Sequence, residues 1–120
     1  MTALPVDIDP TRIDVTVHLA AVPSAAGCTV TVSGEVDSTT APGLRGAVLE
    51  VLARPGLDVV ELDLSGVTFL DSAGLSALAT AHRAALAGGR TLQMRCGTAR
   101  AVVRPLQITG LWDVFTVVDA

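Results

Sequence analysis

Apolar and polar residues alternate with a period of two along four segments of the chain, which is the spacing of strands with one buried face. These segments are residues 13–19, 28–33, 59–64 and 91–96. A shorter apolar run over residues 115–118 predicts a fifth strand near the end of the chain. The pattern therefore predicts four or five strands, each with one apolar and one polar face.

Between and after these strands, apolar residues recur at the spacing of helices that bury one side. The predicted helices span residues 40–54, 72–87 and 98–107. Gly88 and Gly89 end the second helix, whereas Thr98 and Gly110 are the expected cap and stop of the third. Pro105 falls late in the third helix, where it removes a backbone donor and is expected to kink or shorten the last turn.

The order of these elements predicts a mixed α/β sheet. The loop over residues 20–27 suits a hairpin between the first two strands, whereas the helices that join the later strands suit parallel crossovers. A parallel sheet covered on both faces has continuously apolar strands, but these strands are half polar. We therefore expect a two-layer fold of four to five strands with the helices packed on one face. Residues 1–11, which hold two prolines, are interpreted as a tail, and residues 12–120 as one domain.

The composition narrows the range of functions. The 120 residues carry twelve acids against eight arginines and no lysine, and 2% of the residues are aromatic. A net charge of −4 lacks the basic footprint of a nucleic-acid binder, and so few aromatic side chains do not form a base-stacking platform. No run of about 18 apolar residues occurs, so no membrane insertion is expected. The chain start lacks a signal-peptide pattern, and the distant Cys28 and Cys96 suit buried reduced thiols, so we expect a cytoplasmic protein.

The stretch from Phe69 to Ser76 joins the third strand to the second helix and carries candidate chemistry. Asp71 or Ser72 can cap the helix by accepting hydrogen bonds from its first free N–H groups. The same place suits a phosphate on the Ser72 hydroxyl, because unpaired donors and the positive end of the helix dipole favour an anion. Gly74 leaves the first turn without a side chain, which would let a partner's backbone approach closely.

A second acidic segment, residues 33–40, precedes the first helix in the same way. One interpretation is structural, with a turn followed by a helix cap at Asp37 or Ser38. In a right-handed β-α-β unit, however, the carboxyl ends of both strands lie at the same edge of the sheet. We therefore expect Glu35 and Asp37 to share one rim with residues 71–72.

Enzymatic and metal-binding functions fit the sequence poorly. His82 lies ten residues along the same helix as Ser72, a rise of about 15 Å, so it cannot act as the base for that hydroxyl. It shares the apolar stripe of the helix and is expected to be half-buried at the edge of the core. The two histidines and two cysteines lack the spacing of metal ligands. We expect no catalytic residue, no metal and no cofactor, while Trp112 either packs at a helix–strand corner or anchors a partner.

The two acidic segments resemble the motifs of a known family. Ser-Gly-Glu-Val-Asp at residues 33–37 resembles the Gly-Glu-Leu-Asp signature of STAS domains, the anti-sigma factor antagonist family. Asp-Ser-Ala-Gly-Leu at residues 71–75 resembles the phosphorylation motif of that family, and the whole resemblance covers about residues 12–118. Ala73 stands where the family often has a second hydroxyl, which leaves Ser72 as the single hydroxyl within the motif.

The resemblance implies a STAS domain that acts as an anti-sigma factor antagonist. Such a protein binds an anti-sigma factor, often a GHKL-type serine kinase, while its motif serine is free, and a sigma factor is thereby released for transcription. Phosphorylation of Ser72 would end this binding, and a phosphatase would restore it. The implied partner-binding residues are Glu35, Asp37, Ser38, Asp71, Ser72, Ala73, Gly74, Leu75 and Ser76. The alternative is a non-catalytic STAS scaffold in a stressosome-like or membrane-transport accessory complex, and the oligomeric state stays open between a monomer and a weak dimer.

Overall fold

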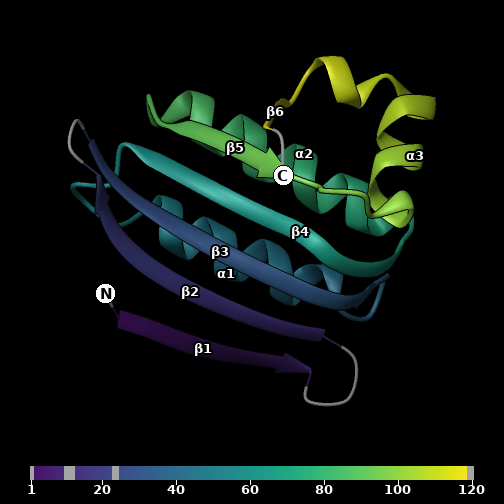
Figure 1. The fold of residues 1–120 in the computed structure, drawn as a ribbon, viewed down its shortest axis with the longest axis horizontal. Helices are drawn as coiled ribbons and strands as arrows, with labels where there is room; N and C mark the ends of the chain where they lie inside the picture. Colours follow the sequence, from purple (N-terminus) through teal and green to yellow (C-terminus); the bar gives the residue numbers. More distant parts are fainter. Residues whose placement is uncertain (1, 10–12, 23–24, 119–120) are drawn as a thin grey trace.

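The computed structural model describes residues 2–9, 13–22 and 25–118 of the chain, with side chains described from residue 27 onward. This description leaves out residues 1 and 10–11 of the expected tail and residues 12 and 119–120 of the expected domain. It also leaves out residues 23–24 of the expected hairpin loop. Along the chain, the described residues form β1 (Thr2–Asp9), β2 (Ile13–Val22), β3 (Ala25–Val36), α1 (Ala41–Leu52), β4 (Val59–Leu70), α2 (Ser72–Ala87), β5 (Thr91–Arg95), α3 (Arg100–Thr109), the short 3-10 helix η1 (Leu111–Asp113) and β6 (Thr116–Val118) (Figure 1).

The strands form one mixed sheet in the order β1-β2-β3-β4-β5-β6. The pairs β1–β2 and β2–β3 are antiparallel, whereas β3, β4, β5 and β6 run parallel to their neighbours. The predicted hairpin and parallel crossovers are therefore confirmed. The hairpin connection is shorter than expected, because β2 extends to Val22 and β3 begins at Ala25.

The sheet has six strands instead of four or five because the expected tail contains β1. Leu4, Val6 and Ile8 alternate with less apolar residues, which is a strand pattern that Pro5 conceals. A proline is compatible with an edge strand, because an edge residue need not donate to a neighbouring strand. β1 occupies this edge and pairs with β2 alone.

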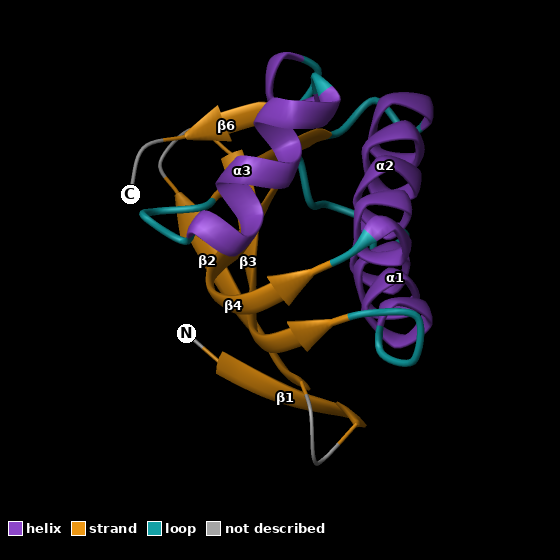
Figure 2. Ribbon diagram, turned by 90° about the vertical axis from the view of Figure 1, so that its right-hand side faces the viewer, coloured by secondary structure: helices purple, strands orange, loops and turns teal. Residues whose placement is uncertain are grey.

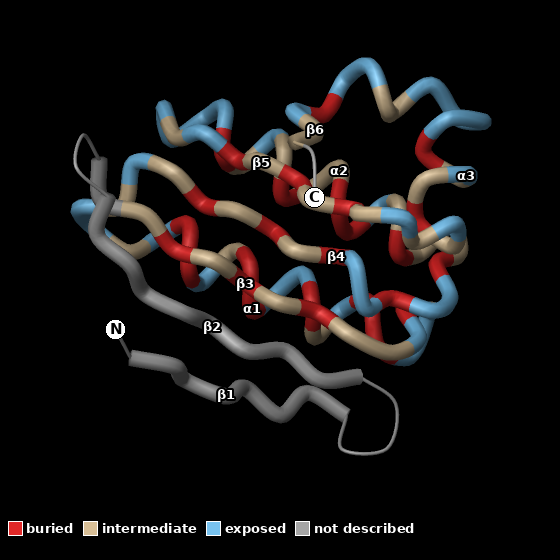
Figure 3. The backbone as a smooth tube through the Cα atoms, in the orientation of Figure 1, coloured by how far each residue is buried: buried red, intermediate tan, exposed pale blue. Residues whose placement is uncertain are grey.

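Helices α1 and α2 lie side by side on one face of the sheet, as the alternation predicts (Figure 2). The buried core fills the space between the sheet and these helices, and Figure 3 shows buried positions alternating with half-buried ones along β3 and β4. α3 packs beside β4, at the end of the sheet where the parallel strands finish (Figure 1). On the uncovered face, Arg95 of β5 pairs with Glu61 of β4 at 3.0 Å.

The helix termini partly match the sequence pattern. The span of α2 is confirmed at residues 72–87, and Gly110, with φ 79°, ends α3 as expected. The cap assigned to Thr98 is wrong, because Ala99 is the N-cap of α3 and provides no side-chain hydrogen bond. The helix also continues past Pro105 to Thr109, whose hydroxyl donates to the Pro105 carbonyl at 2.7 Å. Proline removes one donor here without ending the helix.

β4 runs six residues further than the alternation predicts, because two irregularities interrupt its register with β3. Thr31 pairs with Asp63 but Ser33 pairs with Gly66, so β4 contains one extra residue in this interval. A second extra residue follows, since Gly34 pairs with Val67 and Glu35 with Phe69. Such bulges redirect the side chains that follow them. Beyond Leu64, every third residue of β4 is buried instead of every second.

Candidate functional site

The two acidic segments meet where β3 and β4 end. Glu35 pairs with Phe69 and Val36 with Leu70 in the parallel register. The backbone N–H of Asp71 donates to the carbonyl of Val36 at 3.3 Å, which joins the two strand ends directly. Residues 35–38 and 69–76 therefore form one continuous rim, which we call the acidic rim.

Asp71 holds the beginning of α2. It is the N-cap residue, and its carboxylate accepts a hydrogen bond from the Gly74 N–H at 3.1 Å. Its carbonyl accepts the first helical bond, from the Leu75 N–H at 3.0 Å. The capping function considered for Asp71 is thus confirmed, and Ser72, the first residue of α2, is left exposed at the positive end of the helix.

Gly74 allows α2 to pack closely against the strand ends. It is buried, and a Cβ atom at this position would lie 2.4 Å from Cδ1 of Leu70 and 3.0 Å from Cγ1 of Val36. The sequence suggested that this glycine makes room for a partner's backbone. In the folded chain, the room is occupied by Leu70 and Val36 of the same chain, so a side chain at residue 74 would force these two residues to move.

The other half of the acidic rim is shaped by Asp37 and Thr40. Oδ1 of Asp37 accepts hydrogen bonds from the N–H groups of Thr39 at 2.9 Å and Thr40 at 3.2 Å. The Thr40 hydroxyl donates to the Glu35 carbonyl at 2.9 Å and accepts from the Asp37 N–H at 3.0 Å. The helix cap expected at Asp37 or Ser38 is wrong, because the N-cap residue of α1 is the fully buried Thr40. Its position just before Ala41 and Pro42 was the available signal, because threonine followed by an early proline is typical of a helix start.

The residues assigned to partner binding differ in exposure. Glu35, Ser38, Ser72 and Ser76 are exposed, Asp37, Asp71, Ala73 and Leu75 are half-buried, and Gly74 is buried. Phe69 belongs with them, although the sequence analysis gave it no role. It is 46% exposed and pairs with Glu35 in the register of β3 and β4.

Other conspicuous residues have structural roles. His82 is half-buried with its ring centroid 5.3 Å from that of Phe115, and Trp112 packs against the core. Cys28 and Cys96 are buried and free. Burial, with a smaller contribution from the Asp63 carboxylate, raises the pKa of the Cys96 thiol to about 11, and burial also raises the pKa of Cys28.

The described residues contain neither a candidate metal-binding cluster nor a candidate membrane-spanning helix. Among them, no group of three or more His, Cys, Asp or Glu side chains is arranged to hold a metal ion. No helix within residues 2–9, 13–22 and 25–118 is long and apolar enough to cross a membrane.

Most of the described residues can also be matched to known proteins. A family model described as "Mlab, STAS domain" matches residues 19–118. The anti-sigma-B factor antagonist of Listeria monocytogenes is 30% identical over 86 residues, which are 72% of this chain and 74% of the relative. The protein of the same name from Listeria innocua matches equally well.

Solved structures show the same similarity. An anti-sigma factor antagonist from Mycobacterium paratuberculosis superimposes with a TM-score of 0.69 and 32% identity, over 91% of this chain and 87% of that chain. The anti-sigma factor antagonist SpoIIAA in its unphosphorylated form has a TM-score of 0.67 with 17% identity, over 87% of both chains. At that identity, the second comparison supports the fold alone.

Proposed function

The chain belongs to the STAS-domain anti-sigma factor antagonist family, and we propose that it binds an anti-sigma factor through the acidic rim while Ser72 carries no phosphate. Relatives at 30% and 32% identity bear the name of anti-sigma factor antagonist, and they cover most of the chain. Binding of the anti-sigma factor then frees a sigma factor for transcription.

The observation that carries this proposal is the exposure of Ser72 at the start of a capped helix. Its hydroxyl is accessible to a kinase, whereas Asp71 keeps the helix start in place through the bond to Gly74. A phosphate at this position would add about −1.5 to −2 charges. It would lie within a rim that already carries Glu35, Asp37 and Asp71.

In the proposed switch, the Ser72 hydroxyl attacks the γ-phosphate of ATP in the active site of an anti-sigma kinase, and ADP leaves. The phosphate then crowds the docked partner and repels its acidic groups, so the complex dissociates. A loss of about 3 kcal/mol lowers the affinity more than 100-fold. A phosphatase reverses the change by hydrolysing the phosphate ester. In this scheme, the chain is the substrate of both reactions and catalyses neither.

The test measures binding to a panel of purified anti-sigma factors from the same genome by isothermal titration calorimetry. Ser72→Asp should lower the affinity for the cognate partner about 100-fold, because it places a negative charge where the phosphate would lie. Ser72→Asn is the matched control, because asparagine has nearly the same size without the charge. It should keep the affinity within about fivefold of the wild type. Equal losses in the two variants would show that size, not charge, ends the binding.

A second measurement locates the modification. Incubation with ATP and the cognate anti-sigma factor, followed by mass spectrometry, should place one phosphate on Ser72, and Ser72→Ala should abolish it. Ser76 serves as the internal control, because it is exposed one turn further along the same helix. If no anti-sigma factor of the panel binds the wild-type chain, the antagonist function is wrong and the scaffold alternative is favoured.

A further inference from the structure

One face of α3 combines exposed arginines with an exposed apolar residue. Arg100, Arg104 and Ile108 are four residues apart, so they lie along the same side of the helix. All three are exposed, and Ile108 is 72% exposed. The opposite side is anchored in the core by Val102 and Leu106, which are fully buried. The α3 stripe, as we call Arg100, Arg104 and Ile108, is therefore held in place by packing on its far side.

The arginines of the α3 stripe have no internal function in the fold. Elsewhere, Arg95 pairs with a glutamate of β4, Arg90 donates to the backbone carbonyl of a neighbouring loop, and Arg83 donates to a threonine of its own helix. Within the part of the chain that the structure describes, neither Arg100 nor Arg104 forms a hydrogen bond or an ion pair.

Arg100 is also unfavourable for the helix that contains it. It is the first residue of α3, and the N-cap residue Ala99 provides no side-chain hydrogen bond. The first turn contains no acidic residue that would complement the positive end of the helix dipole. A cation at this end opposes the dipole, so the stability of α3 does not account for Arg100.

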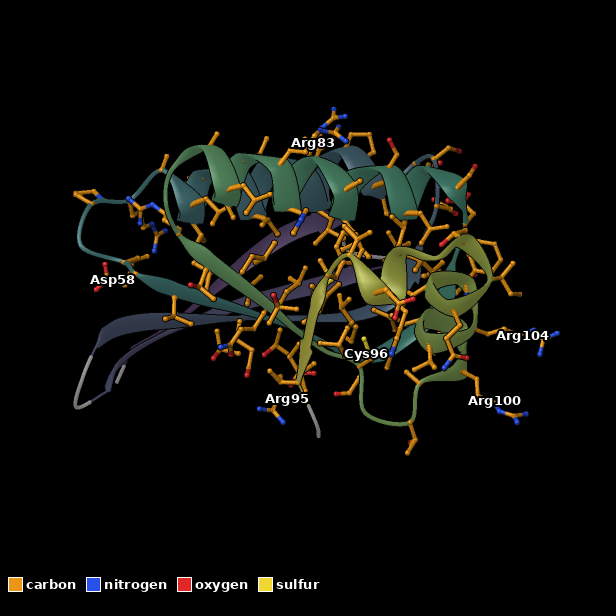
Figure 4. The ribbon with its side chains drawn as sticks, turned by 90° about the horizontal axis from the view of Figure 1, so that it is seen from above. Asp58, Arg83, Arg95, Cys96, Arg100 and Arg104 are labelled. Atoms are coloured by element: carbon orange, nitrogen blue, oxygen red, sulfur yellow. The ribbon has the colours of Figure 1, made fainter. Side chains whose placement is uncertain are left out.

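The α3 stripe lies at the same end of the molecule as the acidic rim. α3 packs beside β4, and Figure 1 shows it where β4 ends and α2 begins. In Figure 4, Arg100 and Arg104 point outward from this end, whereas Arg83 lies over the helical layer. Between Cys96 and Trp112 the charged residues are these two arginines, whereas residues 35–38 and 69–76 carry only acids. This end therefore has a negative half and a positive half.

We propose that the α3 stripe is the second half of the docking surface and receives an acidic segment of the anti-sigma factor that also carries an apolar side chain. This inference rests on the proposed function and specifies the chemistry of the partner. The acids of the partner face Arg100 and Arg104, and its apolar side chain covers Ile108. The positive charges of the α3 stripe attract an acidic partner. The stripe lies on another helix than Ser72, so phosphorylation of the acidic rim adds repulsion of this partner at a separate place.

The test is the double variant Arg100→Glu/Arg104→Glu, measured by calorimetry against the cognate anti-sigma factor. We expect the affinity to fall at least about tenfold, because charge reversal turns two attractions into repulsions. The wild-type affinity should weaken between about 50 mM and about 500 mM salt, and the variant should lose most of this dependence. Arg83→Glu makes the same substitution on the outer side of α2, and it should change the affinity less than about twofold.

Thermal unfolding separates binding from folding. The single variant Arg100→Glu should have a melting temperature equal to or above that of the wild type, because glutamate suits the first turn of a helix. A weaker complex formed by an equally stable protein would therefore identify a lost contact.

Three outcomes would overturn the inference. Unchanged affinity of the double variant, while Ser72→Asp still loses binding, would refute the α3 stripe and leave the proposed function standing. A change in sedimentation from dimer to monomer in the double variant would assign the stripe to a second copy of the chain. Failure of the wild-type chain to bind any anti-sigma factor would remove the proposed function and, with it, this partner.

Discussion

Replacing Gly74 by alanine tests the packing that positions Ser72. A Cβ atom at residue 74 would lie 2.4 Å from Cδ1 of Leu70 and 3.0 Å from Cγ1 of Val36, both shorter than normal contacts. Gly46 is a suitable control because it lies within α1, is exposed, and has no atom within 4 Å of a Cβ added there. The two substitutions are chemically the same and differ in the space that the new methyl group enters.

The two substitutions are expected to change the free energy of unfolding in opposite directions. Alanine in place of glycine stabilises an exposed helix interior by about 0.5–1 kcal/mol, which is the expectation for Gly46→Ala. Gly74→Ala gains at most the same amount, but the inserted methyl group overpacks the strand ends at a cost of about 1–3 kcal/mol. We therefore expect Gly74→Ala to be destabilised by up to about 2 kcal/mol, and the two variants to differ by about 1–3 kcal/mol.

Urea unfolding measures this difference, followed by far-ultraviolet circular dichroism and by the fluorescence of Trp112, the single tryptophan of the chain. Leu70→Val supplies a second arm, because valine has no δ carbon to meet the new Cβ. In the double variant Gly74→Ala/Leu70→Val, the destabilisation should be smaller than the sum of the single effects.

The result that would refute this reasoning is a gain in stability for Gly74→Ala as large as that for Gly46→Ala. In that case, Leu70 would move aside freely, and the close approach of α2 to the strand ends would not depend on glycine. Additive effects of Gly74→Ala and Leu70→Val would refute the specific contact between these two residues.

Three further predictions concern the cap, the exposed aromatic residue and the buried thiols. Asp71→Ala should lower the free energy of unfolding by about 1 kcal/mol in urea titrations, whereas Asp71→Asn, which can still cap α2, should lower it by only a few tenths. Phe69→Ser should weaken binding to the cognate anti-sigma factor about fivefold or more by calorimetry without lowering the melting temperature, and an unchanged affinity would exclude Phe69 from the interface. The chain has no lysine and no tyrosine, so between about pH 9 and about pH 11 the side chains that titrate are Cys28 and Cys96. Because their pKa values are raised by folding, the unfolded thiols lose their protons first, and stability should be constant just below pH 9 and fall as the pH rises toward about 11. Cys96→Val should flatten this decline in urea titrations, and an equal decline in that variant would contradict the assignment.

The elements whose pattern is local can be predicted from the amino-acid sequence. Alternation over residues 28–33 and 91–96 predicts β3 and β5, because a strand with one buried face must place apolar residues at every second position. The span of α2 was equally readable, because Asp71 caps it and Gly88 and Gly89 follow it. The acidic rim also follows from order alone, since parallel strands joined by helices end at the same edge of the sheet.

Other features depend on register and on packing between distant segments, so they could not be predicted before the fold was known. The two bulges of β4 arise from its pairing with β3, and they bury Val67, which alternation beyond Leu64 would place on the uncovered face. The function of Gly74 depends on Leu70 and Val36, which contact it only after two strands and a helix have come together. The position of α3 beside β4 likewise places Arg100 and Arg104 at the same end as Ser72. Periodicity reports which side of one element is apolar, whereas the neighbours of that side are set by how the elements pack.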